Sequence, residues 1–90
     1  MQLMMSQAGH SYRVERLLGR EKQQQLLENM GFVPGATLKV VSDLHTNLII
    51  LIKNTRIGLS RELAQKVLVE EIAEEDWEAV PTQSPERRLL

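Results

Sequence analysis

Hydrophobic and polar residues alternate near the start of the chain, over residues 11–18. Tyr12 and Val14 fall on one side of an extended backbone, and the charged residues that follow each of them fall on the other. A period of two residues is typical of a strand with one buried face. We therefore expect a first strand here, with Tyr12 and Val14 in the core.

The next segment, residues 20–30, consists of good helix formers. Leu26, Leu27 and Met30 are related by helical spacing, so they form one apolar stripe along a helix. We expect a helix that buries this stripe.

A cap and a turn follow this helix. Gly31 suits the left-handed position after a helix C-terminus, and in the Schellman form of this cap Phe32 packs back on Leu27. Pro34 and Gly35 then fit the two central positions of a type II turn, where glycine supplies the positive φ. The chain is therefore expected to pass tightly from the helix into the next strand.

Two further segments predict strands. Residues 36–42 alternate, with Val41 on the outer face, whereas residues 48–53 are apolar on both faces. Because a strand with one solvated face should alternate, we expect a helix or another molecule to cover the second face of residues 48–53. The residues of its first face are Leu48, Ile50 and Ile52, and those of its second face are Ile49 and Leu51.

Shorter elements complete the pattern. Residues 56–59 predict a short strand, Ser60 caps a helical turn over residues 61–66, and residues 67–72 predict a last strand. About five short strands, one helix after the first and a helical turn before the last describe a mainly β chain. Such a chain forms a small, partly open β-barrel.

Three motifs in this chain match a known family in their order and spacing. They are Tyr12-Arg13-Val14, then Met30-Gly31-Phe32-x-Pro34-Gly35 after the helix, and Arg56-x-Gly58-Leu59-Ser60 before Ala64 and the terminal VLVEEI. On these residues, positions 11–72 resemble the ferrous iron transport protein A (FeoA) family. The resemblance implies an SH3-like β-barrel. It also implies a non-enzymatic cytosolic accessory of bacterial ferrous-iron uptake that modulates the assembly or activity of the GTPase-bearing membrane permease, FeoB.

The residues that carry the resemblance are expected to serve the fold. An SH3-like fold does not by itself imply binding of proline-rich peptides, because such grooves are lined by several aromatic rings. With Tyr12 in the core, this chain retains too few. The structural group consists of Gly31, Phe32, Pro34, Gly35, Gly58 and Leu59.

The composition agrees with one small domain. The 90 residues are 42% hydrophobic and 26% charged, and none is cysteine, which excludes disulfides and a thiolate nucleophile. The longest apolar run, residues 48–52, is far shorter than the roughly 20 residues of a membrane span, and the N-terminus lacks the pattern of a secretory signal. We expect a cytoplasmic protein that its partner recruits to the inner face of the cell membrane.

Charge is distributed unevenly along the chain. Up to Ile72 there are nine basic and seven acidic residues, and after it two basic and five acidic ones. The small positive excess of the first part is too weak for a nucleic-acid surface, and three aromatic residues are too few for a base-stacking platform. Residues 1–10 are expected to be a flexible leader. Residues 73–90 are expected to be a mobile acidic tail, in which Trp77 either docks back on the domain or anchors a partner.

Metal and catalytic chemistry find little support in the sequence. Asp43 and His45 lie two positions apart and could touch one ion, but a facial triad needs a second histidine, and His10 is far away along the chain. A turn aspartate and a loop histidine are the preferred interpretation, so no metal site and no cofactor is assigned. Ser60 is interpreted as a helix cap, and Arg56 as a strand-edge cation in preference to an arginine finger for a partner's GTPase.

Two surfaces are candidates for binding protein. The first is the second face of residues 48–53, which is covered either by the helix or by another protein, a second copy of this chain included. The other is the exposed side of the helix. Two rival functions stay open: a regulatory module related to those of metal-dependent repressors, acting in trans, and a nucleic-acid-binding barrel. The candidate residues are Val41, Ile49, Leu51 and Arg56 on the strands, Glu21, Lys22 and Gln25 on the helix, and Trp77 in the tail.

Overall fold

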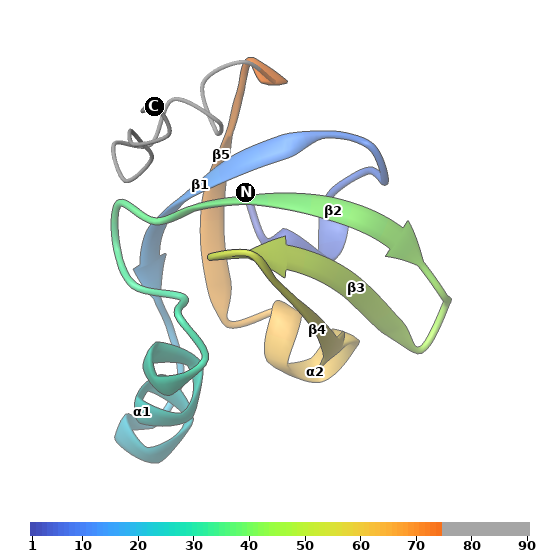
Figure 1. Ribbon diagram of the computed structural model, residues 1–90. Helices are drawn as coiled ribbons and strands as arrows, with labels where there is room; N and C mark the ends of the chain where they lie inside the picture. Colours follow the sequence, from blue (N-terminus) through green and yellow to red (C-terminus); the bar gives the residue numbers. More distant parts are fainter. Residues whose placement is uncertain (75–90) are drawn as a thin grey trace.

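The computed structural model describes residues 1–74. They form one antiparallel sheet with the strand order β4-β3-β2-β1-β5, which curls into a partly open barrel with α1 beyond the end of β1 (Figure 1). The predicted mainly β fold, with five strands, a helix after the first and a helical turn before the last, is confirmed. The elements are η1 (Leu3–Met5), β1 (Ser11–Leu17), α1 (Glu21–Asn29), β2 (Thr37–Asp43), β3 (Asn47–Ile52), β4 (Thr55–Ser60), α2 (Arg61–Ala64) and β5 (Val67–Ile72).

The core lies inside the curved sheet, because alternate residues of each strand point inward. Tyr12 and Val14 of β1 are each 1% exposed, as predicted. The other buried hydrophobic residues are Leu3, Leu27, Phe32, Leu38, Val40, Leu48, Ile50, Ile52, Leu59, Ala64, Val67 and Val69.

None of the helices in residues 1–74 has the length and apolar character of a membrane-spanning segment.

The N-terminal segment differs from the flexible leader that the sequence predicts for residues 1–10. The N-terminal amine donates a hydrogen bond of 2.9 Å to the Val69 carbonyl, and Gln2 forms a β-bridge with Leu68. Leu3 in η1 is fully buried, since η1 packs against β5 and α2. The apolar residues of this short segment show no clear helix or strand periodicity, so the burial of Leu3 depends on tertiary packing that the local pattern does not contain.

The helix α1 ends in the predicted Schellman cap. The Phe32 amide donates to the Leu27 carbonyl at 3.0 Å, and the Gly31 amide donates to the Glu28 carbonyl at 2.9 Å. Gly31 has a φ of +104°. Phe32 and Leu27 are both part of the hydrophobic core.

The buried stripe of α1 is narrower than predicted. Leu27 is fully buried, whereas Met30 is half-buried and Leu26 is 48% exposed. The prediction that Leu26 is buried is therefore wrong. Only the side of α1 that carries Leu27 faces the core. One narrow apolar side is enough to pack a short helix against the barrel.

Two local predictions near the strands are confirmed. The Ala36 amide donates to the Val33 carbonyl at 2.9 Å, and Gly35 has a φ of +92°, as a type II turn requires. Ser60 caps α2, because its Oγ accepts a hydrogen bond of 3.2 Å from the Leu63 amide. The residues that fix the C-terminal end of α1 and the N-terminal end of α2 thus lie within a few positions of these ends.

Candidate functional site

The outer face of β2, β3 and β4 brings together the strand residues predicted to bind protein. Leu51 lies between Lys39 and Arg56 in the register of the sheet. On the neighbouring row of the same face, Ile49 pairs with Gly58. We call Lys39, Val41, Ile49, Leu51, Arg56 and Gly58 the outer patch.

Val41 lies at an irregularity in β2. Val40 pairs with Ile50 and Ser42 pairs with Ile49, so Val41 is the extra residue of a β-bulge. A bulge bends its strand and changes the direction of the side chains around it. The alternation assigned Val41 to the outer face, but the bulge itself had no signal in the alternation.

The apolar part of the outer patch is only partly covered. Ile49, Leu51 and Val41 are half-buried, and Gly58 contributes no side chain above Ile49. Figure 1 shows α1 away from β3, beyond the end of β1, and α2 at the turn between β4 and β5. Within residues 1–74, no helix covers this face, so the first of the two predicted covers is wrong. The other alternative, that a second molecule covers the face, stays a proposal.

Two cations flank the apolar part. The Lys39 side chain is 28% exposed, and its Nζ lies 2.5 Å from Glu74 Oε2. Arg56 is exposed on the edge strand β4 and forms no ion pair among the described residues. Lys39 was not among the candidates from the sequence. The alternation of β2 pointed it outward, but only the register places it beside Leu51.

The candidate residues of the helix form a separate surface. Glu21, Lys22 and Gln25 are all exposed on α1, close in sequence to the exposed Leu26. The structure does not bring them together with the outer patch (Figure 1). Trp77 lies outside the described residues.

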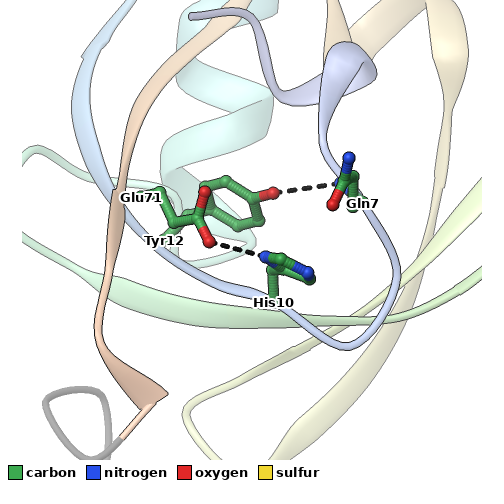
Figure 2. A network of polar contacts seen from close by, with 4 residues as sticks. All are labelled: Gln7, His10, Tyr12 and Glu71. Atoms are coloured by element: carbon green, nitrogen blue, oxygen red, sulfur yellow. Dashed lines mark hydrogen bonds and ion pairs between the residues drawn. The ribbon is translucent and has the colours of Figure 1, made fainter.

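The tyrosine and the phenylalanine of the described part of the chain are both absent from its surface. Tyr12 is inside the barrel, where its hydroxyl accepts a hydrogen bond of 3.0 Å from the Gln7 amide (Figure 2). Phe32 is fully buried. A groove for proline-rich peptides, which grips its ligand between exposed rings, cannot be assembled from residues 1–74.

Two of the three residues considered for metal binding, Asp43 and His10, have other side-chain partners. Asp43 Oδ1 accepts a hydrogen bond of 2.9 Å from the His45 amide and lies 3.5 Å from Arg61 Nη1, so Asp43 is the turn aspartate that the sequence favoured. His10 Nδ1 lies 2.5 Å from Glu71 Oε2 (Figure 2). No group of three or more potential ligand residues occurs within residues 1–74.

The fold and this surface can be compared with known proteins. The FeoA domain model matches residues 1–71. The crystal structure of an iron uptake regulatory protein, FeoA, is 29% identical with a TM-score of 0.76, and the match covers 80% of this chain and 97% of that one. The zinc complex of FeoA from Stenotrophomonas maltophilia, described as a prokaryotic SH3 domain protein, is 24% identical with a TM-score of 0.70, and the match covers 78% of this chain and 89% of that one.

A manganese-dependent transcriptional repressor shares the fold at lower identity, 17%, with a TM-score of 0.72, and the match covers 80% of this chain and 41% of that one. IdeR from T. acidophilum is 16% identical with a TM-score of 0.73, and the match covers 80% of this chain but 34% of that one. No curated protein matches the sequence. The curved sheet is therefore the SH3-like barrel that the motifs implied, and the family model spans nearly all the residues that form it. This chain belongs to the FeoA family of ferrous iron transport proteins.

Proposed function

We propose that this chain is a non-enzymatic accessory of bacterial ferrous-iron uptake that binds the cytosolic, GTPase-bearing part of a FeoB-type permease and modulates its assembly or activity. The observation that carries the proposal is the FeoA domain over residues 1–71. In this role the chain is cytoplasmic and is recruited to the inner face of the cell membrane by its partner.

The outer patch is the surface that we assign to the permease. Its half-buried aliphatic centre of Ile49 and Leu51 lies between the cations of Lys39 and Arg56. Protein interfaces have this anatomy, with an apolar centre and a polar rim, and arginine is enriched among the residues that dominate binding energy. Burial of about 100 Å² of this apolar surface contributes about 2.5 kcal/mol to association.

A role by contact also fits the side chains that could otherwise suggest chemistry. The Ser60 hydroxyl is used in the cap of α2, and Asp43 is used in its turn. Arg56 is exposed near the start of the edge strand β4 and pairs with Leu51 of the apolar patch, a setting that suits a contact residue. We assign it to recognition of the permease and not to its GTPase centre.

The test is a binding measurement with matched variants. The full chain is titrated against purified permease in nanodiscs, and Leu51→Asp is compared with Leu26→Asp. Both change an accessible leucine to aspartate, one on the outer patch and one on α1. We expect Leu51→Asp to lose at least about tenfold in affinity, equal to about 1.4 kcal/mol, and Leu26→Asp to bind as the unmodified chain does.

The same titration can contradict the proposal. A folded Leu51→Asp that binds with full affinity, together with a loss in Leu26→Asp, would transfer the contact to α1. Failure of the unmodified chain to bind the permease would remove the proposed function itself.

A second function is favoured by one observation, the fold shared with a manganese-dependent transcriptional repressor. In that case the chain is a regulatory module that acts in trans on another protein. A pull-down from bacterial membranes, run beside a salt-titrated oligonucleotide assay, separates the alternatives. Retention of the permease supports the first function, and salt-sensitive binding of the oligonucleotide supports a nucleic-acid role.

A further inference from the structure

One continuous row of residues crosses the outer face, from the end of β5 to the outer patch. Ile72 pairs with Ser11, and Ser11 pairs with Lys39. Lys39 in turn pairs with Leu51, whose partner on β4 is Arg56. Neighbouring strands lie about 4.8 Å apart, so only about three such spacings separate Ile72 from Leu51. The chain therefore leaves β5 on the row that contains the outer patch.

A side chain just after β5 already reaches this row. Glu74 Oε2 lies 2.5 Å from Lys39 Nζ, although β2 is two strands away from β5. Ser11 on the intervening strand faces outward by its register, yet it is only 2% exposed. The outer face is thus covered at Ser11, and the Glu74 side chain reaches past β1 to β2.

The next residues complement the outer patch in chemistry. Residues 74–78 read EEDWE, which we call the EEDWE segment, and they place Trp77 between acids. The outer patch has the reverse arrangement, with the aliphatic Ile49 and Leu51 between two cations. An indole gains by covering apolar surface, and acids gain beside cations.

The EEDWE segment also has the necessary reach. Three residues lead from Glu74 to Trp77, and an extended chain of that length spans about 10 Å. From Lys39, which Glu74 contacts, the next strand is about 5 Å away. Gly58 leaves room beside Ile49, since a side chain there would stand over it.

We propose that the EEDWE segment covers the outer patch of its own chain, with the Trp77 indole packed on Ile49 and Leu51 and the acidic side chains facing the two cations. A partner that binds the outer patch must then displace this segment. The contact within the chain is independent of the proposed function, and its effect on the permease rests on that function.

The test uses Trp77 as its own probe, because it is the only tryptophan in the chain. In the full chain we expect its fluorescence to be blue-shifted and less accessible to acrylamide than in Leu51→Asp. If the covered form is the major population, the substitution raises quenching by about twofold or more. Leu26→Asp is the matched control and leaves both readouts unchanged, and circular dichroism verifies that each variant is folded.

A charge reversal gives the second arm. Arg56 is exposed, so Arg56→Glu does not disturb the core, and the test stays decisive even if Leu51→Asp unfolds. We expect Arg56→Glu to increase acrylamide quenching of Trp77, and Lys22→Glu on α1 to leave it unchanged. Equal quenching in the unmodified chain, Arg56→Glu and Lys22→Glu overturns the proposal. A fluorescence shift on dilution also overturns it, because the segment would then come from a second copy.

The permease supplies a third arm. Trp77→Ala in the full chain should bind the permease more tightly, since the competing contact is weakened. Weaker binding of Trp77→Ala would instead make the indole an anchor for the partner and overturn the competition. A further outcome is that fluorescence shows a protected Trp77 while neither the unmodified chain nor Trp77→Ala binds the permease. In that case the contact within the chain stands and the proposed function fails.

Discussion

The two faces of β3 contain the same kinds of side chain in different surroundings. The inward residues Leu48, Ile50 and Ile52 are at most 1% exposed, whereas the outward Ile49 and Leu51 are half-buried. Hydrophobicity alone does not decide burial in this strand. The direction of each side chain and what packs over that face decide it. We assign the inward residues to the fold and the outward residues to binding.

The difference between the inward and outward faces of β3 is tested most strongly by truncating one side chain on each of them. Ile50→Ala leaves a cavity in the core and should lower the free energy of unfolding by about 2–5 kcal/mol. Leu51→Ala should lower it by less than about 1 kcal/mol, because this side chain is already partly in contact with water. Urea denaturation measures both. Equal losses would show that Leu51 is a core residue and not a binding residue.

Two glycines extend the comparison from side chains to the backbone. Gly31 has a φ of +104°, so Gly31→Val should lower the free energy of unfolding by more than about 1 kcal/mol. The space around it is not the cause, since an added Cβ would lie 3.6 Å from the nearest atom. Gly58 lies in a strand on the outer patch, and Gly58→Val should cause no loss, because valine favours strands. Thermal melting distinguishes the two, and unchanged melting of Gly31→Val would contradict the cap.

Charge introduced on the outward face separates folding from association. Ile49→Asp and Leu51→Asp should retain the circular dichroism spectrum of the folded chain and lose co-elution with the permease in size-exclusion chromatography. The reason is that aspartate can remain solvated on a partly exposed face but not inside an apolar interface. A variant that loses its folded spectrum as a monomer would assign that residue to the core.

The smallest effect on stability is expected at the rim of the outer patch. Arg56 is exposed and has no ion pair among the described residues, so Arg56→Glu should change the free energy of unfolding by no more than about 0.5 kcal/mol. The same change should slow association with the permease and alter its salt dependence. Stopped-flow binding at several salt concentrations measures this, and an unchanged rate would remove Arg56 from the interface.

Much of the fold could be predicted from the sequence, because the decisive signals are local. The cap at Gly31, the turn at Gly35 and the cap at Ser60 each depend on residues a few positions apart. The alternation in β1 predicted the burial of Tyr12 and Val14 for the same reason.

The failures depend on contacts between distant parts of the chain. Leu3 is buried because η1 meets β5 and α2, and Leu26 is exposed because only one line of α1 faces the barrel. For the candidate site, the apolar second face of β3 was visible in the sequence. The place of Lys39 beside Leu51 and the bulge at Val41 required the register.

The proposed contact between the outer patch and the permease is tested most directly by mapping the interface on this chain by NMR. The ¹⁵N-labelled full chain is titrated with the purified permease, and the amide signals that shift or broaden are assigned. We predict that the signals of Ile49, Leu51 and Arg56 change first, while those of Glu21 and Lys22 on α1 stay in place. Changes confined to α1, with the β3 and β4 signals unaffected, would contradict it.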